Sequence, residues 1–376
     1  MTTVHQPFDV RIFHRECVAL RTLGYQVFLI CCYGKDEERE GIQILGLGER
    51  KGLLSRFFIK PMYLLFRAFR LKADLYHFHD PELIPYMFLL KVISRKPIIF
   101  DIHENIEAQN SYRTHFSNFL SRILMKTYII LQKILVNHFR IVTVVEEIAE
   151  KYKGAIVVKN FCSKAILSYD LPIETNNYFS SDALKLIYIG GVGAERGDET
   201  MIRSVHALKA SYGLKAYLTI IGLTNEQRKL VLKKLVKKLD LSEQIFLLDH
   251  RPYSTALSYV RASDIGLCLL KKNDNYTNSI ATKLFEYMAF SKPVICSDFP
   301  CWREYILYKP CGIMVDPDNT DKICKAIKKI YQNPDLYKLY GKNGYNNFIT
   351  KYNWESEFKK MEALYQQILT DGKGKK

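Results

Sequence analysis

The 376-residue sequence lacks any apolar run near the roughly 18 to 20 residues that a helix needs to cross a bilayer. It also begins without the basic-then-apolar pattern of a secretory signal peptide. We therefore expect any membrane attachment to be peripheral. No internal repeat of solenoid length is present, which excludes a repeat array.

The cysteines lack the C-x-x-C spacing of a metal or redox motif, and their number, nine, is odd. Most of them lie within apolar runs such as residues 294–296. We interpret them as reduced thiols in the core of a cytosolic protein.

Acidic residues are scarce, because 39 of them face 55 basic residues and leave a net charge of +16. Such a surplus attracts phosphate in nucleic acid, anionic lipid or a nucleotide. No nucleic-acid-binding module is recognisable, so we expect no nucleic-acid partner. The shares of hydrophobic residues, 48%, and charged residues, 25%, are typical of a folded globular protein and exclude disorder or a fibre.

Short β-branched runs alternate with longer helical patterns along the chain, as in βαβ units. The expected strands of the first half are residues 26–32, 75–78, 98–101, 141–144 and 156–158. Those of the second half are residues 186–190, 217–222, 245–248, 265–270, 294–297 and 312–315. The sequence predicts an α/β protein with two doubly wound, mainly parallel sheets.

A polar stretch from Ser163 to Asp182 breaks the periodicity and predicts an interdomain linker. The predicted parts are a first domain at 1–165, a linker at 166–182, a second domain at 183–350, a last helix at 351–370 and a frayed tail at 371–376. Ligands of such sheets bind beyond the carboxyl ends of the strands, so we expect the active site in the cleft between the domains.

The segment from Asn275 to Asp298 is the most informative one. A polar loop leads into a helix near Thr282, whose first-turn N–H groups suit a diphosphate. Lys283 adds a cation there, and Glu286 on the same helix face could accept two hydrogen bonds from a ribose diol. The alternative is an ordinary surface ion pair between Lys283 and Glu286.

A second candidate segment is the strand at Leu186 that runs into a glycine-rich loop. Gly190, Gly191 and Gly193 allow a ligand to approach the backbone, and Arg196 could reach a phosphate. The loop fails the G-x-G-x-x-G pattern because position 196 is Arg, so we do not expect an NAD enzyme. The alternative is a plain tight turn between strand and helix.

Two groups of histidines and acids follow strands, at residues 77–82 (HFHDPE) and 101–104 (DIHE). His77 and His79 on one strand face are a conceivable pair of metal ligands. We favour roles in lining a cleft or starting a helix, and predict no metal.

Residues 50–72 contain seven basic residues, five aromatic ones and no acid, and residues 111–140 contain five basic residues and no acid. Basic amphipathic helices with aromatic residues suit the surface of an anionic membrane. The alternative is a pair of helices that pack on a sheet with a solvated basic face.

These segments together resemble the retaining nucleotide-sugar glycosyltransferases of family 4, which have the GT-B fold of two Rossmann-like domains. The resemblance covers nearly the whole chain. Its most telling parts are DLYHFHDPELIP from Asp74, KPIIFDIHE from Lys96, LIYIGGVGAERGDETMI from Leu186 and IATKLFEYMAFSKPVICSD from Ile280.

The resemblance implies that a UDP- or GDP-sugar is bound by the second domain and an acceptor mainly by the first. It also implies transfer with retention and without a metal or other cofactor. The implied donor residues are Gly190, Gly191, Arg196, Asn278, Thr282, Lys283, Leu284 and Glu286, with Arg251 and Tyr253 near the base. The implied residues elsewhere are His103 near the donor sugar, as a catalytic contact, and His5, Arg11, Asp80 and Glu104 on the acceptor side.

The chain departs from the family pattern at three places. Asn278 stands where the first Glu of a Glu, seven residues, Glu motif is usual, and Gly191 stands where an Arg is usual. Only Met1 to Val4 precede His5, so the first strand of the family is expected either upstream or in this short segment.

Two functions therefore stay open. The first is a transferase that extends a lipid-linked glycan in surface polysaccharide or lipopolysaccharide synthesis, at the inner face of the cytoplasmic membrane. The second is a catalytically inactive subunit that binds a sugar nucleotide or glycan, because the amide of Asn278 carries no charge.

Overall fold

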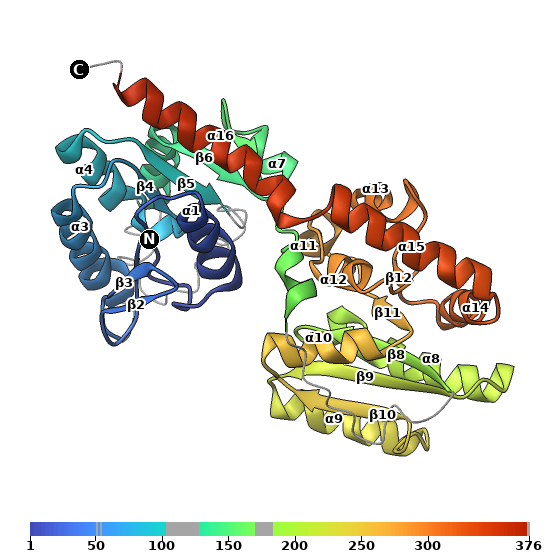
Figure 1. Ribbon diagram of the computed structural model, residues 1–376. Helices are drawn as coiled ribbons and strands as arrows, with labels where there is room; N and C mark the ends of the chain where they lie inside the picture. The colour runs from blue at the N-terminus through green and yellow to red at the C-terminus, as the bar shows by residue number, and fades with distance from the viewer. Residues whose placement is uncertain (50–51, 53–54, 103–127, 170–182, 374–376) are drawn as a thin grey trace. The chain divides into compact units, whose positions relative to one another are not determined.

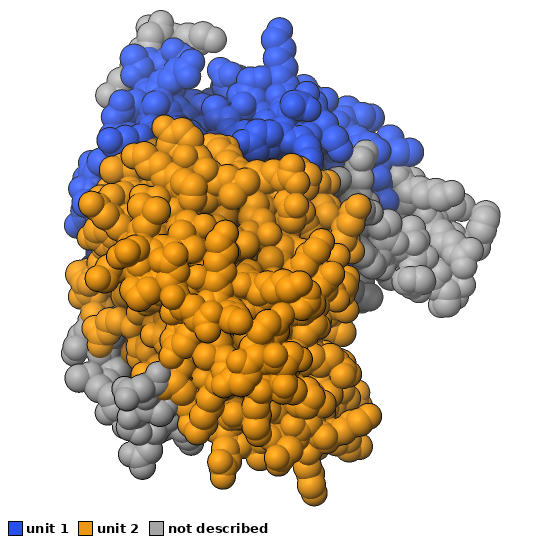
Figure 2. All heavy atoms as spheres, turned by 90° about the vertical axis from the view of Figure 1, so that its right-hand side faces the viewer, with its two compact units in different colours: residues 1–160, 357–376 blue, residues 161–356 orange. Residues whose placement is uncertain are grey.

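The computed structural model describes residues 1–49, 52, 55–102, 128–169 and 183–373. The chain forms two compact units, which Figure 2 distinguishes by colour. Unit 1 comprises Met1–Asn160 and Glu357–Lys376, and unit 2 comprises Phe161–Ser356. Each unit has its own β-structure and its own hydrophobic core.

Unit 2 is built on one six-stranded sheet (Figure 1). Its strands are β8 (Leu184–Ile189), β9 (Ala216–Leu223), β10 (Ile245–Asp249), β11 (Ile265–Cys268), β12 (Val294–Ser297) and β13 (Gly312–Val315). They pair in parallel in the order β10-β9-β8-β11-β12-β13. The order changes direction between β8 and β11, which is the point where sheets of this kind bind ligands.

Helices cover both faces of this sheet. They are η6 (Lys164–Ser168), η8 (Ala194–Arg196), α8 (Asp198–Tyr212), α9 (Glu226–Lys238), α10 (Tyr253–Ala262), α11 (Asp274–Thr277), α12 (Lys283–Ala289), η9 (Pro300–Trp302), α13 (Arg303–Leu307), α14 (Thr320–Tyr331) and α15 (Pro334–Thr350). Alternate residues of β8 point to opposite faces: Ile187 packs with α10 and α12, whereas Leu186 packs with α8, α9 and α14. The predicted doubly wound architecture is confirmed.

Unit 1 contains two smaller sheets. Its strands are β1 (Phe28–Cys31), β2 (Glu37–Arg39), β3 (Ile42–Gly46), β4 (Tyr76–Phe78), β5 (Ile98–Ile102), β6 (Arg140–Thr143) and β7 (Ile156–Val157). One sheet has the parallel order β4-β5-β6-β7. The other has the order β1-β3-β2, in which β1 and β3 are parallel and β2 is antiparallel to β3.

The first two residues connect these two sheets. The N–H of Thr2 donates to the carbonyl of Ile30 in β1 at 3.0 Å, and the N–H of His79 donates to the carbonyl of Met1 at 3.2 Å. Met1 and Thr2 thus lie between β1 and the end of β4, in the place where we expected either a short segment or an upstream strand.

The helices of unit 1 include one that arrives from the far end of the sequence. They are η1 (Val10–Cys17), α1 (Val18–Thr22), η2 (Ser55–Ile59), α3 (Lys60–Leu71), η3 (Pro81–Leu83), α4 (Ile84–Ser94), η5 (Val136–His138), α7 (Glu146–Ala149) and the greater part of α16 (Trp354–Lys373). Met361, Leu364 and Ile368 of α16 are buried. Glu357 of the same helix accepts a hydrogen bond of 2.8 Å from the N–H of Lys159.

Each strand expected from the sequence is present, whereas β2 and β3 were not predicted. They form a hairpin whose turn residues, Glu40 and Gly41, both have positive φ. The predicted linker begins within η6, and its residues 170–182 lie outside the described residues. In the described part of the chain, no helix is both long enough and apolar enough to cross a membrane.

Candidate functional site

The candidate donor site begins at the carboxyl end of β8, beside the point where the strand order reverses. Gly190 has φ of +114°, and a Cβ there would lie 3.2 Å from Nζ of Lys283. A Cβ at Gly191 would lie 3.4 Å from Cζ of Arg196. The two glycines therefore leave room for two cationic side chains.

The loop after β8 packs against the chain that follows β11. Gly197 has φ of +75°, and a Cβ there would lie 2.0 Å from the carbonyl oxygen of Leu269, which only glycine permits. The N–H of Lys271 donates to the carbonyl of Glu195 at 2.8 Å. These contacts fix the loop that carries Arg196 at the switch point of the sheet.

Lys283, the first residue of α12, is buried, with 8% of its surface exposed. Its Nζ lies 3.2 Å from the hydroxyl oxygen of Tyr188 and 4.3 Å from the centre of the Tyr188 ring. The Tyr188 hydroxyl donates in turn to the carbonyl of Gly191 at 2.6 Å. This relay holds the ammonium group beside the glycine turn.

Arg196 ends η8, with its Cζ 5.4 Å from the centre of the Tyr276 ring. Among the described residues, neither Arg196 nor Lys283 forms an ion pair with a carboxylate. Two neighbouring cations, one of them buried, repel each other without an anion between them. The arrangement therefore favours a bound anion such as a diphosphate.

Glu286 lies on α12 one turn after Lys283 and is buried. It does not pair with Lys283, so the surface ion pair considered as the alternative is absent from the described structure. Tyr253, the first residue of α10, instead donates a hydrogen bond of 2.6 Å to Oε1 of Glu286. The hydrogen bond orients a carboxylate that could accept the hydroxyls of a ribose.

The remaining predicted donor residues differ in their exposure. Asn278 is exposed at the end of α11, and Arg251 is exposed just before α10. Thr282 is half-buried at the start of α12. Leu284 is fully buried in the core and its N–H donates to the carbonyl of Ala281, so it offers a ligand neither side chain nor N–H.

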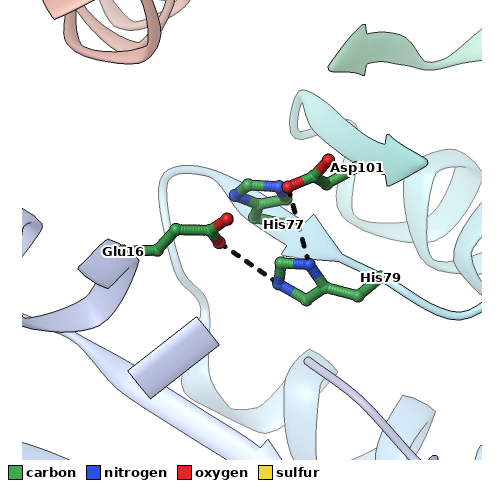
Figure 3. A group of neighbouring side chains, drawn as sticks. All are labelled: Glu16, His77, His79 and Asp101. Atoms are coloured by element: carbon green, nitrogen blue, oxygen red, sulfur yellow. Dashed lines mark ion pairs between the residues drawn. The ribbon is translucent and has the colours of Figure 1, made fainter. Parts of the chain in front are cut away.

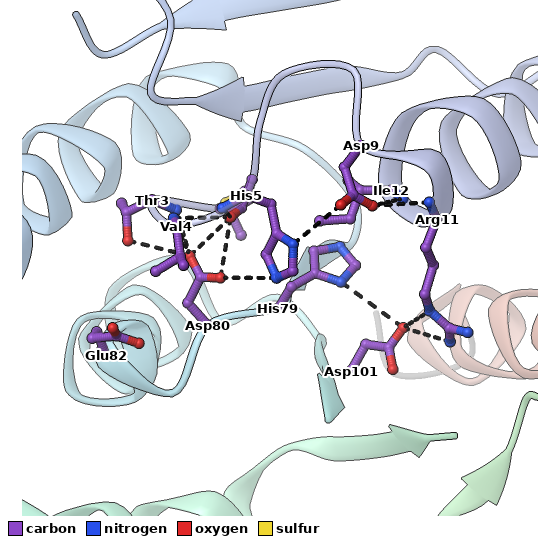
Figure 4. A network of polar contacts seen from close by, with 12 residues as sticks. Thr3, Val4, His5, Asp9, Arg11, Ile12, His79, Asp80, Glu82 and Asp101 are labelled. Atoms are coloured by element: carbon purple, nitrogen blue, oxygen red, sulfur yellow. Dashed lines mark hydrogen bonds and ion pairs between the residues drawn. The ribbon is translucent and has the colours of Figure 1, made fainter. Parts of the chain in front are cut away.

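The acceptor-side prediction in unit 1 falls on a buried polar network around Asp80 (Figure 4). The Asp80 carboxylate accepts hydrogen bonds from the Thr2 hydroxyl at 2.9 Å and from the N–H of Val4 at 3.1 Å. Burial, helped by the charge of Glu82, raises the pKa of Asp80. His5, whose side chain is 29% exposed, lies with Nε2 3.7 Å from Asp80 Oδ1.

Arg11, also predicted on the acceptor side, is buried between two carboxylates. Its guanidinium donates to Oδ2 of Asp101 at 2.8 Å and lies 2.9 Å from Oε1 of Glu16. Burial and the neighbouring charge of Asp101 raise the pKa of Glu16 well above its usual range. Arg11 and Asp80 thus face protein partners, while His103 and Glu104 lie outside the described residues.

Sequence reasoning missed the residues that hold the candidate donor residues in place. Tyr188 supports Lys283 from β8, and Tyr276 lies against Arg196. The position of Tyr188 two residues before the glycine turn is a usable signal, because the last residues of such a strand flank a bound ligand. Tyr253, which the resemblance places near the base, also donates a hydrogen bond to Glu286.

Comparison with known proteins agrees with this architecture. The family model described as "Glycosyltransferase Family 4" matches residues 10–158, and the one described as "Glycosyl transferases group 1" matches residues 174–347. Together with the sheets and the site described above, these matches identify a glycosyltransferase with the GT-B fold. The chain belongs to glycosyltransferase family 4.

One curated relative, the uncharacterized glycosyltransferase MJ1069 of Methanocaldococcus jannaschii, is 24% identical over 186 residues. The match covers 50% of this chain and 46% of that protein, so it spans less than half of the relative's length.

Two solved structures share the fold. Sucrose-phosphate synthase from Thermosynechococcus elongatus has a TM-score of 0.73 at 15% identity, with 96% of this chain and 94% of that chain covered. Anabaena Alr3699/HepE in complex with UDP and glucose has a TM-score of 0.71 at 11% identity, with 97% and 98% covered.

Proposed function

We propose that the protein is a retaining glycosyltransferase that moves a sugar from a nucleotide-sugar donor to a lipid-linked glycan. The observation that supports this most is the pair of cations, Arg196 and Lys283, beside the glycine turn at the switch point of unit 2. Family membership supplies the reaction class, and this pair supplies a place for the diphosphate.

The donor would bind along the carboxyl end of the sheet. Lys283 and Arg196 would contact the diphosphate, Glu286 the ribose diol, and the segment at Arg251 the base. The UDP in the Alr3699/HepE complex supports a nucleoside diphosphate donor, and both UDP- and GDP-sugars fit the proposal.

In the reaction, negative charge develops on the departing diphosphate as the bond to the sugar breaks. Lys283 and Arg196 would stabilise that charge, and a single such donor contributes about 3 to 4 kcal/mol in comparable sites. Retention would follow from attack on the face that the diphosphate leaves, without a nucleophile from the protein. The proposal needs no metal at the donor site.

The lipid-linked acceptor is supported by the surface of α3. Met62, Phe66 and Phe69 are 54%, 53% and 46% exposed and recur at the spacing of one helix face. The guanidinium of Arg70 lies 5.3 Å from the centre of the Phe66 ring. Aromatic residues mixed with cations suit the headgroup region of an anionic bilayer, here the inner face of the cytoplasmic membrane.

The second basic segment, residues 111–140, is described only from residue 128. Residues 128–135 are helical, and Ile130 and Ile134 on this helix are 58% and 59% exposed. They are a second exposed apolar area of unit 1 that could contact a membrane.

The proposal is tested by nucleotide release from a panel of UDP- and GDP-sugars, with membrane lipid extract as acceptor. We expect release from one donor by the wild type and its loss in Glu286→Ala. Glu304→Ala is the matched control, because Glu304 is exposed and pairs with Lys351 away from the glycine turn. Equal release by wild type and Glu286→Ala would contradict the proposed donor site.

A second candidate, an inactive subunit that binds the sugar nucleotide, is favoured by one observation, the exposed amide of Asn278 in place of a carboxylate. Nucleotide binding that depends on Glu286, with no release from any donor, would support this subunit. Asn278→Glu would then be the variant that restores transfer.

A further inference from the structure

Unit 1 contains a buried group of four side chains that sequence analysis did not bring together (Figure 3). Glu16 comes from η1, His77 and His79 come from β4 and the residue after it, and Asp101 comes from β5. One nitrogen or oxygen atom from each lies within 4.8 Å of the corresponding atoms of the other three. These elements are distant in sequence, so the fold assembles the group.

The group is unusual because its four polar side chains are largely buried. Glu16, His79 and Asp101 are 2%, 5% and 0% exposed, and His77 is half-buried. His79 lies between the two acids, with Nε2 3.5 Å from Glu16 Oε2 and Nδ1 3.9 Å from Asp101 Oδ2. Such a concentration of polar atoms in a core is costly unless a partner compensates for it.

Arg11 contacts both acids of the group. Its guanidinium lies 2.9 Å from Oε1 of Glu16 and 2.8 Å from Oδ2 of Asp101, and so holds the two side chains close to the imidazoles. The two imidazoles add donor nitrogens but no charge when they are neutral. Binding of a metal cation would explain why the two imidazoles lie beside the two acids.

The imidazoles are already held in fixed orientations. The rings of His77 and His79 are stacked, with centres 4.7 Å apart and planes inclined by 29°. Nδ1 of His77 lies 2.7 Å from the hydroxyl of Tyr365 on α16. A hydrogen bond to one ring nitrogen is the usual way in which a protein orients a histidine so that the other nitrogen can bind a metal.

The mixture of donors selects the class of ion. Mg²⁺ and Ca²⁺ take oxygen ligands, whereas imidazole nitrogens with carboxylates suit Zn²⁺ and its first-row neighbours. Four ligands from the protein form a closed tetrahedral site of the structural kind. Ligand atoms around such a zinc lie about 3.3 to 3.6 Å apart, so small side-chain rotations would close the group from its present spacing.

We propose that Glu16, His77, His79 and Asp101 form a structural zinc site that ties η1 to the carboxyl ends of β4 and β5. This departs from the sequence-based expectation of no metal. It is independent of the proposed donor site, because its four residues belong to unit 1 and the donor residues belong to unit 2.

The test is zinc binding by the purified full-length chain after treatment with a chelator, with Zn²⁺ alone as the probe. We expect about one tightly bound ion per chain in the wild type, measured by competition with a chromophoric chelator. This tightly bound zinc ion should be lost in Glu16→Gln and in the double variant His77→Gln with His79→Gln. His206→Gln, which changes an exposed histidine of unit 2, should retain it.

Circular dichroism of each variant shows whether it has folded. A second measurement, which needs only the wild type, is the visible spectrum of bound Co²⁺. Co²⁺ in the site should show the visible bands of a tetrahedral nitrogen and oxygen environment. Absence of a tight equivalent in the wild type would overturn the proposal. Retention of zinc by the folded variants, or a thiolate-to-cobalt band that indicates cysteine ligands, would overturn it as well.

Discussion

The hydroxyl of Tyr253 donates a hydrogen bond of 2.6 Å to Oε1 of Glu286 and so joins the start of α10 to the carboxylate on α12. The two residues are 33 positions apart in the sequence. The contact allows Tyr253 to position Glu286, and its predicted place near the base stays a prediction.

Tyr253→Phe should weaken nucleotide binding roughly tenfold, because the carboxylate loses a charge-assisted hydrogen bond that fixes its orientation. Calorimetric titration with UDP and GDP measures the effect. The matched control is Tyr212→Phe, which removes a hydrogen bond of 2.9 Å to Asp321 on an exposed surface. Equal affinities of wild type and Tyr253→Phe would show that the hydrogen bond does not serve the donor.

Lys283→Met should weaken nucleotide binding without reducing the stability of the fold. The buried ammonium has no carboxylate partner among the described residues, so an apolar side chain of similar length should leave the free energy of unfolding nearly unchanged. Nucleotide affinity should fall between roughly 10- and 100-fold as a charged contact is lost.

The matched control for this change is Lys292→Met. Lys292 precedes β12 at the opposite end of the strand from the glycine turn, and burial lowers its pKa. Urea unfolding and nucleotide titration of both variants check the expectation. A marked loss of stability in Lys283→Met, with affinity intact, would assign Lys283 to the fold alone.

Gly190→Ala should destabilise unit 2 and impair nucleotide binding. Its φ of +114° is unfavourable for alanine by about 1 to 3 kcal/mol, and the added Cβ would lie 3.2 Å from Nζ of Lys283. Gly193→Ala is the control in the same loop, because Gly193 is extended and a Cβ there meets no atom within 4 Å. Equal melting temperatures of Gly190→Ala and Gly193→Ala would contradict this prediction.

Asp9→Asn should alter the acid dependence of stability. Asp9 accepts hydrogen bonds from the N–H groups of Arg11 and Ile12 at the start of η1 and lies 3.3 Å from Nδ1 of His5. Burial alone would raise its pKa, but these hydrogen bonds lower it from 3.8 to about 2.

Because the folded pKa of Asp9 lies below the unfolded value, its stabilisation is complete above about pH 4 and is lost as the pH falls through about 2. Asparagine keeps the capping oxygen but loses the charge. The variant should be about 1 to 2 kcal/mol less stable at pH 7, allowing for partial exposure, and the difference should shrink in acid. Urea unfolding at several pH values would refute this if the difference stayed constant.

Phe66→Ser combined with Phe69→Ser should release the protein from anionic vesicles in a sedimentation assay. Both side chains are about half exposed on α3 and would lose their apolar contact with the bilayer. The matched control is Leu230→Ser with Val231→Ser, two similarly exposed residues on α9 of unit 2. Sedimentation of the α3 variant at the wild-type level would refute the membrane-facing surface.

The basic residues of the same segment are poorer test positions than its aromatic residues. Arg56 donates a hydrogen bond of 2.7 Å to the buried carboxylate of Glu82. Arg67 donates to Asp36 at 2.9 Å and to the carbonyl of Gly46 at 2.7 Å. Substitution of these arginines would disturb the fold of unit 1. Loss of vesicle binding by such variants would therefore not show that the arginines contact the membrane.

Strands such as β8, β11 and β12 could be predicted because they are short apolar runs that are almost wholly buried. The β2–β3 hairpin was missed because β2 is the charged tripeptide Glu37–Arg39, whose residues have little strand preference. Its formation depends on pairing with β3, a contact that local composition does not reveal.

The placement of the candidate donor residues could be predicted where the signal is local, as for Gly190 beside its strand or Lys283 and Glu286 on one helix turn. Arg11 was assigned to an acceptor, but it faces Asp101, 90 residues away, inside the core. Glu16 was not singled out at all, because its neighbours in the sequence do not show that η1 turns it toward His79. Such groups arise only when separate elements pack together.

The return of α16 to unit 1 sets an order of events during synthesis. Residues 161–356 form unit 2 as one continuous stretch, so the whole of this unit is translated before most of α16. The first 160 residues must wait for Met361, Leu364 and Tyr365 to cover them. The unit that is translated first is therefore completed last, and until then its apolar surface is open to chaperones and to aggregation.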